Sequence, residues 1–237
     1  DYAGLKIVVA LVRSLAEQTS IPVVLHLDHG KSLERVQACI EAGYTSVMLD
    51  ASTKPFDENI RMTKQAAQYA HDRGVWVEAE LGAILGKEGM VQLKGGRMPE
   101  RVMTDPTQAA HFVEATGVDA LAVSVGTIHG AFTGQEYIRF ELLEEIQTAV
   151  PLIPLVIHGA SGIADEHLQR VAKMQVCKIN IDTELRMVFD TALRVVLAEH
   201  RAMVDPREVL GAAREAVQEV VAKKIKLFGS AGKSKLD

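Results

Sequence analysis

The chain has 237 residues, is 48% hydrophobic and carries a formal net charge of −5, a composition typical of a globular protein with a substantial core. The acidic balance and an aromatic content of 5% argue against nucleic acid or acidic membranes as partners. The sequence shows no signal peptide and no apolar stretch of membrane-spanning length. Cys39 and Cys177 lie in a helix-like and a strand-like run, and we expect both to be reduced, buried residues of a cytoplasmic protein.

Apolar runs alternate with amphipathic stretches along the chain, a pattern that predicts repeated β-α units. In chain order, the expected elements are a helix over 4–18, a strand over 21–28, a helix over 32–43, a strand over 45–50, a helix over 55–74, a strand over 75–82, a helix over 105–117, a strand over 119–126, a helix over 140–150, a strand over 153–159, a helix over 165–174, a strand over 177–181, and helices over 182–200 and 206–229. The segment 83–103 has no clear period and is long for a β-α connection, which favours a functional, mobile loop over a disordered insertion.

The six expected strands are almost continuously apolar, as strands of a parallel sheet covered on both faces should be. Two α/β folds fit this pattern. A doubly wound sheet accommodates six strands, whereas a closed (β/α)8 barrel needs eight. The pattern alone leaves both folds open.

Three histidines share one local arrangement, in which an apolar run is followed by His and then Gly: His29, His129 and His158. The carboxyl ends of parallel strands face one common rim, so three such imidazoles can meet at one point and offer the three protein ligands of a catalytic zinc. A single strand-end histidine is more often a hydrogen-bonded structural residue, but the repetition favours a shared metal. His26 should lie on the opposite strand face from His29, as a core residue or as a partner of a ligand.

Two further stretches predict anion binding. Residues 158–162, HGASG, form a turn of small residues that can present backbone N–H groups. Asp182 and Thr183 stand where a strand passes directly into a helix, and a helix start favours negative charge. Plain N-capping is the alternative role of these two residues. Together with the histidines, the two stretches suggest a substrate with phosphate groups on either side of a metal.

An ordered set of motifs resembles the class II (zinc-dependent) fructose-bisphosphate and tagatose-bisphosphate aldolases. The motifs are LHLDHG, TSVMLDAS, VEAELG, GTIHG, IHGASG, KINIDTELR, DPREVLGAAREA and KKIKLFGSAGK. The resemblance implies a single (β/α)8 TIM-barrel domain over 1–237, with the first two strands missing from the printed sequence. It also implies reversible cleavage of a ketose bisphosphate to dihydroxyacetone phosphate and glyceraldehyde 3-phosphate. A zinc ion would stabilise the enediolate charge as a Lewis acid.

The resemblance assigns roles to individual residues. Asp28 would handle the proton of the C4 hydroxyl, and Glu88 would move the proton at the dihydroxyacetone phosphate carbon from a closing loop. The alternative for Asp28 is to hydrogen-bond to a ligand histidine and orient its ring. The resemblance also implies that the zinc ligands are His29, His129 and His158. Glu80 would be an alternative ligand, and Asp50 would play a related, lesser part.

The same resemblance implies substrate contacts and an oligomer. Gly130, Gly159 and Ser161 would cradle the phosphate of the dihydroxyacetone half, Asn180 would contact the reacting carbons, Asp182 the substrate hydroxyls, and Thr183 phosphate. A monovalent cation, Na⁺ or K⁺, would bind near the phosphate. Arg207 would reach the far phosphate of a neighbouring subunit's substrate, which implies a homodimer or homotetramer.

Three departures from the family pattern leave the substrate open. Gly89 replaces an acidic neighbour of Glu88, Thr133 stands where a phosphate-binding lysine is common, and 50–53 reads DAST in place of DGSH. Fructose 1,6-bisphosphate is the first expectation, with tagatose bisphosphate or another sugar phosphate as the alternative. A barrel metal-dependent hydrolase is disfavoured because the sequence has no His-x-His pair. A non-catalytic aldolase-like subunit is the remaining alternative.

Overall fold

The computed structural model describes residues 2–84, 86–92, 102–132 and 138–234, with the backbone alone for 87–92 and 131–132. The helices are α1 (Leu5–Ala16), α2 (Leu33–Ala42), α3 (Phe56–His71), α4 (Pro106–Thr116), α5 (Phe140–Ala149), α6 (Asp165–Val171), α7 (Thr183–Glu199) and α8 (Pro206–Leu227). The strands are β1 (His26–Gly30), β2 (Ser46–Leu49), β3 (Trp76–Leu81), β4 (Gly86–Gln92), β5 (Ala120–Val123), β6 (His129–Phe132), β7 (Leu155–Ile157) and β8 (Val176–Ile179).

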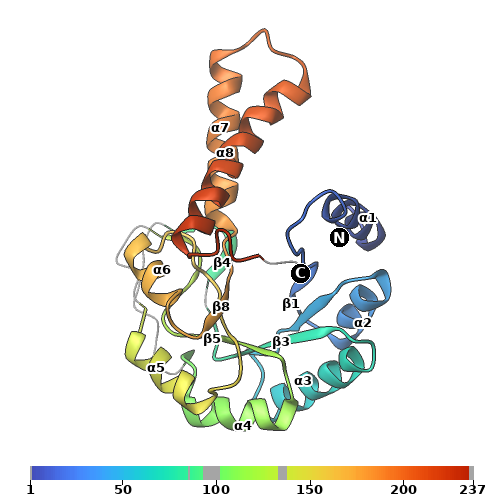
Figure 1. Ribbon diagram of the computed structural model, residues 1–237, viewed down its shortest axis with the longest axis vertical. Helices are drawn as coiled ribbons and strands as arrows, with labels where there is room; N and C mark the ends of the chain where they lie inside the picture. Colours follow the sequence, from blue (N-terminus) through green and yellow to red (C-terminus); the bar gives the residue numbers. More distant parts are fainter. Residues whose placement is uncertain (1, 85, 93–101, 133–137, 235–237) are drawn as a thin grey trace.

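Six strands form one parallel sheet in the order β1-β2-β3-β5-β7-β8. The order follows the chain without a reversal, whereas a doubly wound sheet reverses at a switch point. Figure 1 shows the sheet curled, with α2 to α6 arranged around its outer side. A singly wound sheet with helices on its outer side is the arrangement of a barrel, and here it forms about half of one.

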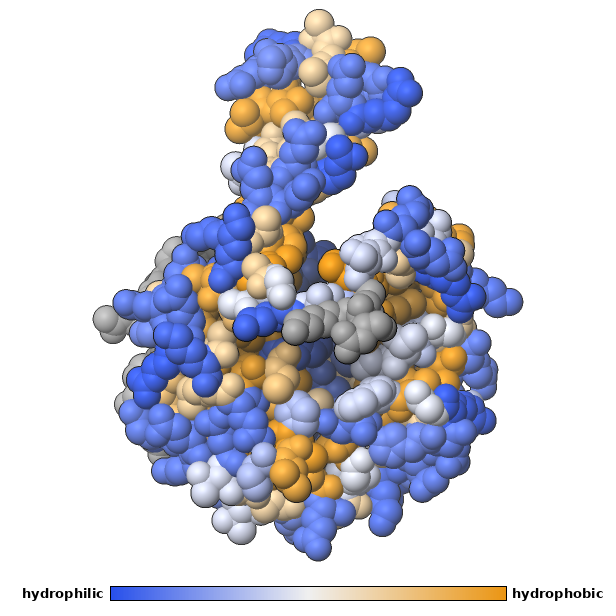
Figure 2. Space-filling model, viewed as in Figure 1, coloured by the Kyte–Doolittle hydropathy of each residue, from blue (hydrophilic) through white to orange (hydrophobic). Residues whose placement is uncertain are grey.

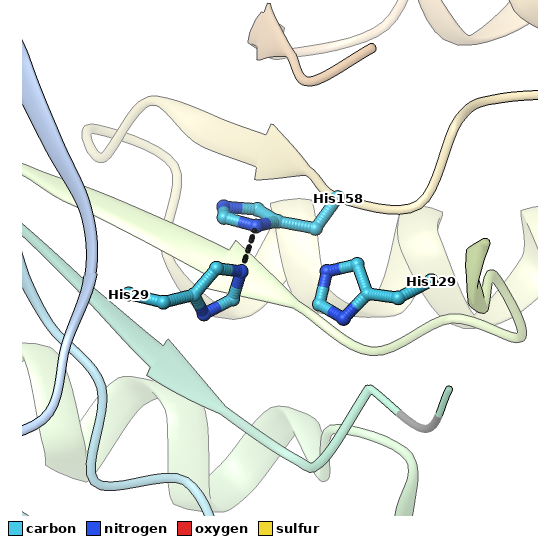
Figure 3. A group of neighbouring side chains, drawn as sticks. All are labelled: His29, His129 and His158. Atoms are coloured by element: carbon cyan, nitrogen blue, oxygen red, sulfur yellow. Dashed lines mark hydrogen bonds between the residues drawn. The ribbon is translucent and has the colours of Figure 1, made fainter. Parts of the chain in front are cut away.

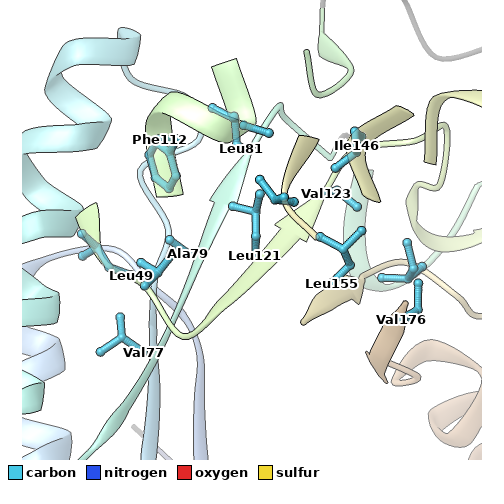
Figure 4. Packing of buried hydrophobic residues seen from close by; sticks show 14 of the residues in the cluster. Leu49, Val77, Ala79, Leu81, Phe112, Leu121, Val123, Ile146, Leu155 and Val176 are labelled. Carbon is cyan, nitrogen blue, oxygen red and sulfur yellow. The ribbon is translucent and has the colours of Figure 1, made fainter. Parts of the chain in front are cut away.

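Side chains alternate along each strand and divide the sheet into two different faces. On β3, Val77, Ala79 and Leu81 point outward into the main core, where they pack with Leu121 and other apolar residues (Figure 4). The inner face has a much smaller apolar cluster of Met48, Ala122 and Val156. The remaining inner positions are therefore available for polar chemistry, as the site below shows.

Two strands were missed in the sequence. β4 lies inside the segment 83–103, which we expected to be a loop, and it pairs in parallel with β6 in a separate two-stranded sheet. β4 contains glycines and charged residues among its seven positions, and β6 has only four residues, so neither shows the period of a buried strand. Residues 93–101 of the segment lie outside the described residues.

Two other expectations were wrong. The strand predicted over 21–28 begins only at His26, and Val24 before it is 67% exposed. Cys177 of β8 is exposed, whereas Cys39 is buried as expected. Both cysteines are free.

Helices α7 and α8 pack on each other and project away from the sheet as a two-helix arm (Figure 1). Apolar side chains lie exposed between the hydrophilic ones along it (Figure 2), among them Leu197, Val204 and Leu210. Lys224 of α8 contacts Glu184 of α7 at 3.1 Å, an ion pair at the base of the arm. Among the described helices, none has the length and hydropathy needed to cross a membrane.

Candidate metal and phosphate site

The three strand-associated histidines meet at one point on the inner side of the sheet (Figure 3). His29 lies at the end of β1, His129 begins β6, and His158 directly follows β7. One nitrogen from each ring lies within 4.8 Å of the others. The ring centroid of His29 is 4.9 Å from that of His129 and 4.7 Å from that of His158. The geometry therefore agrees with the convergence that the sequence predicted.

His29 adopts an unusual backbone conformation that accounts for its position. Its φ of 46° is the one positive value found at a non-glycine residue in the described ranges, and the β1-β2 register shifts between Leu27 and Gly30. A left-handed residue costs free energy and is often found at functional sites. The same irregularity breaks the strand alternation, so His26 and His29 both reach the inner side. The expectation that they occupy opposite faces was wrong for this reason.

In two of the three histidines, a carboxylate hydrogen-bonds to the outer ring nitrogen, the one that faces away from the point where the rings meet. Nδ1 of His29 lies 2.7 Å from Oδ2 of Asp50, and Nε2 of His158 lies 2.8 Å from Oε1 of Glu78. The inner nitrogens, Nε2 of His29 and Nδ1 of His158, are left 3.0 Å apart (Figure 3). Two histidine nitrogens on a tetrahedral zinc are separated by about 3.3 Å. The residues present therefore fit a divalent metal held by imidazoles whose other nitrogens are hydrogen-bonded.

The pKa values of the rings differ with their partners. Burial alone would lower the pKa of His29, but the hydrogen bond with Asp50 and the charges of Asp28 and Glu80 raise it above its usual value. Burial and the two neighbouring rings lower the pKa of His129 to about 4. His129 is therefore neutral at pH 7, the form in which imidazole binds a metal.

Two acidic residues next to His29 have opposite pKa shifts. Burial disfavours the charge of Asp50, but hydrogen bonds from His29, Lys31 and Ser52 lower its pKa well below the usual range. Burial, reinforced by the charge of Asp50, raises the pKa of Glu80 to about 7. Oε2 of Glu80 is buried and has no hydrogen-bond partner among the described residues. With His29 and Asp50, it forms a second group of side chains close enough to hold an ion.

Asp28 lies beside the histidines without hydrogen-bonding to them. Its Oδ1 is 3.9 Å from Nε2 of His29 and 3.9 Å from Nδ1 of His158, and its side chain is 41% exposed. Nδ2 of Asn180 donates to both of its oxygens at 3.3 Å. A solvent-accessible carboxylate is thus held next to the candidate metal position.

A cavity of about 500 Å³ opens next to this carboxylate, between the β1 and β8 edges of the sheet. It is lined by eight of the catalytic, metal-binding and substrate-binding residues that the sequence predicted. These are Asp28, His129, Gly130, Gly159, Ser161, Asn180, Asp182 and Thr183. The structure therefore brings the two predicted anion-binding stretches to one cavity.

Close packing explains why glycine occupies position 159. Its φ is +65°, and a Cβ there would lie 2.5 Å from the carbonyl oxygen of Ile128. Ser161 is buried, and its Oγ accepts from the backbone N–H of Glu184 in the first turn of α7, at 3.2 Å. The side chain of Asp182 does not cap α7; both its oxygens accept from Nε of Arg186 at 2.8 Å. The N-capping alternative is thereby excluded for Asp182.

Comparison with known proteins decides the family. The profile described as fructose-bisphosphate aldolase class-II matches residues 1–233. The chain belongs to the class II fructose-bisphosphate aldolase family. Its members are lyases, and the family is metal-dependent and acts on sugar phosphates.

Similar proteins support the assignment to class II aldolases. The chain is 43% identical over 233 residues to the fructose-bisphosphate aldolase of Geobacillus stearothermophilus, covering 98% of this chain and 79% of that protein. It is 42% identical to the enzyme of Staphylococcus aureus strain Mu50, with coverages of 99% and 79%. The crystal structure of the YdjI aldolase from Escherichia coli K12 superposes with a TM-score of 0.83 at 37% identity, covering 98% and 79%. The predicted α/β barrel fold is thereby confirmed.

One residue that the aldolase resemblance singled out, Arg207, lies outside the cavity described above. Arg207 lies in the first turn of α8 at the far end of the two-helix arm, where its side chain is 89% exposed and pairs with Asp205. Glu88 lies on β4, but its side chain is outside the described part of the chain, as is all of Thr133. The exposed Arg207 does not contribute to the cavity of its own subunit.

Sequence reasoning missed two charged residues next to the three histidines. Glu78 is 3% exposed and hydrogen-bonds to His158, and Lys178 lies 2.9 Å from Glu78. Both belong to strands made up mainly of apolar residues. One signal could have identified Glu78. It lies two positions before Glu80, so the two side chains share the inner face of the sheet.

Proposed function

We propose that the protein catalyses the zinc-dependent, reversible cleavage of fructose 1,6-bisphosphate to dihydroxyacetone phosphate and glyceraldehyde 3-phosphate. The observation that carries the proposal is the meeting of three imidazoles beside an accessible carboxylate, at the mouth of a cavity lined by Gly159, Ser161 and Thr183. Tagatose 1,6-bisphosphate, which differs in configuration at one carbon, is the second candidate. The relatives named above support the fructose substrate.

His29, His129 and His158 would hold the zinc, and the buried Glu80 would be an alternative ligand with Asp50 supporting it. A bound divalent ion would supply Lewis-acid stabilisation of negative charge at the ketone end of the substrate. Asp50 and Glu78 hold the outer nitrogens of two ligands, which orients the rings before any metal arrives.

Asp28 would remove the proton from the C4 hydroxyl as the C3–C4 bond breaks, and would return it in the condensation direction. Asn180 donates to both oxygens of Asp28 and so keeps the carboxylate turned toward the substrate. Glu88 would move the proton at the carbon of the dihydroxyacetone half. These steps need no lysine Schiff base.

The remaining residues would bind and orient the two phosphate ends. Gly130, Gly159 and Ser161 would bind one phosphate together with Thr183, and Asp182 would contact substrate hydroxyls. Na⁺ or K⁺ would bind near this phosphate. Arg207, exposed on the arm, would reach the substrate of a second subunit, so the working form would be a homodimer or homotetramer. We place the reaction in the cytoplasm, in glycolytic carbohydrate metabolism.

A cleavage assay on fructose, tagatose and sedoheptulose bisphosphates tests the proposal. We expect the fructose compound to be cleaved fastest, EDTA to abolish cleavage, and zinc to restore it. Borohydride added with substrate should trap no covalent lysine adduct. Cleavage that persists in EDTA, or a trapped adduct, would refute the metal mechanism, and a preference for tagatose bisphosphate would move the assignment to the second candidate.

A further inference from the structure

Side chains from three strands meet on the inner face behind His158. They are Glu78 of β3, Lys178 of β8 and His26 of β1. Nζ of Lys178 lies 2.9 Å from Oε2 of Glu78, and Nε2 of His26 lies 3.6 Å from the same oxygen. The strands that carry them are separated in the sheet, so the three side chains approach one another across the concave interior.

Glu78 uses its two oxygens for different partners. Oε1 accepts from Nε2 of His158 at 2.8 Å, while Oε2 contacts Lys178. A carboxylate that contacts an ammonium group through one oxygen accepts through the other, so the hydrogen of the His158 ring is on Nε2 and the lone pair of Nδ1 faces His29.

His26 does not supply the positive charge next to Glu78. Burial and the charge of Lys178 lower the pKa of His26 to about 4, so its ring is neutral at pH 7. Nδ1 of His26 is 2.8 Å from Oγ of Ser46, its cross-strand neighbour. Among the described residues in contact with Glu78, Lys178 therefore carries the compensating charge. A carboxylate that is 3% exposed needs such a partner to stay ionised.

We propose that Lys178 is a positioning residue for the metal site: it holds Glu78, which in turn fixes the His158 ring with Nδ1 toward the ion. The inference rests on the proposed metal site and assigns Lys178 no contact with the reacting atoms. Its side chain is 34% exposed and borders the cavity. Direct binding of a substrate phosphate by Lys178 is the competing role, and the experiment below separates the two.

The test is zinc affinity, measured on the metal-free protein in competition with a chromophoric chelator. Outer-shell partners of a ligand histidine are worth about 10–100-fold in metal affinity. We expect Lys178→Met and Glu78→Gln to weaken zinc binding by about that factor. Lys178→Arg keeps the charge near Glu78 and should stay within about threefold of the wild type. Lys173→Met removes an exposed lysine just after α6 and should change nothing.

Cobalt provides a second readout. The visible absorption of the Co²⁺-loaded protein should shift in Lys178→Met and return toward the wild-type spectrum in Lys178→Arg, because it reports ligand geometry. If Lys178→Met fails to fold by circular dichroism, Lys178→Gln takes its place, since the amide keeps a hydrogen-bond donor near Glu78 and loses the charge.

The outcomes separate this inference from the proposed function. Wild-type protein that binds no zinc would overturn both. If the wild-type protein binds zinc and a folded Lys178 variant binds it with unchanged affinity, the inference is wrong and the proposed metal site is retained. A raised KM for substrate at unchanged zinc affinity would assign Lys178 to phosphate binding instead.

Discussion

Nε2 of His29 and Nδ1 of His158 lie 3.0 Å apart, although 129 positions of sequence separate the two residues. Each ring is fixed from behind by a different carboxylate, Asp50 for His29 and Glu78 for His158. The pair is therefore oriented by the protein and does not depend on the metal for its geometry.

Replacing a ligand histidine should release the metal. We expect His158→Ala to weaken zinc binding by more than about 100-fold, the upper value for an outer-shell partner, because a ligand itself is lost. Equilibrium dialysis followed by metal analysis measures this. His200→Ala is the matched control, since His200 follows α7 on the exposed arm. Full zinc content in a folded His158→Ala protein would remove His158 from the ligand set.

Removing the carboxyl group of Asp28 should stop the reaction and spare the fold. We expect Asp28→Ala to lower kcat for cleavage by about 10²–10⁴-fold, the usual contribution of a positioned acid or base. Zinc content and thermal stability should stay close to the wild type, because Asp28 is 41% exposed and lies 3.9 Å from the nearest imidazole nitrogens.

Asp57→Ala is the control for Asp28, since Asp57 is an exposed carboxylate on α3, on the outer side of the sheet. Its kcat should be unchanged. An Asp28→Ala enzyme that cleaves substrate at the wild-type rate would exclude Asp28 as the acid/base.

Glu80 should make the stability of the metal-free protein depend on pH. Its pKa is raised to about 7 in the folded state, mainly by burial, against a usual value of 4.5. The free energy of unfolding thus has a contribution from Glu80 that is fully present below about pH 4.5 and is lost as the pH rises to 7. Glu80→Gln imitates the protonated form. It should therefore stabilise the protein at pH 8 by about 1–3 kcal/mol and have little effect at pH 4.5.

Urea unfolding in EDTA at several pH values measures this effect. The difference in free energy of unfolding between Glu80→Gln and the wild type should grow between pH 4.5 and 7 and then level off. Glu114→Gln on α4 is the control for the loss of one carboxylate. A difference for Glu80→Gln that stays constant across this range would show that the Glu80 carboxyl does not titrate with a raised pKa.

A pair of glycine substitutions tests the packing of the anion cradle. Gly159→Ala should destabilise the protein by about 1–3 kcal/mol, because its φ is +65° and the new Cβ would lie 2.5 Å from the oxygen of Ile128. Gly211→Ala should stabilise it by about 0.5–1 kcal/mol, since Gly211 lies within α8 with open space around it. Thermal unfolding of both variants gives the comparison. A tolerated Gly159→Ala would mean that the turn adjusts to a side chain.

The strand-end histidines could be predicted because each follows an apolar run and precedes glycine, and parallel strands bring such positions together. The relation of His26 to His29 could not, since it depends on a left-handed residue that interrupts the alternation. Glu78 and Lys178 were also missed. Their role depends on a contact between β3 and β8, and contacts between strands that are not neighbours in the sheet cannot be predicted from the sequence pattern.

Three imidazoles should share one zinc ion, and X-ray absorption at the zinc edge of the metal-loaded protein can show whether they do. We expect one zinc per chain, nitrogen or oxygen neighbours at about 2.0–2.1 Å, and the outer-shell scattering of three imidazoles. A first shell containing sulfur, or an imidazole signal unchanged when His29 and His129 are replaced, would contradict it.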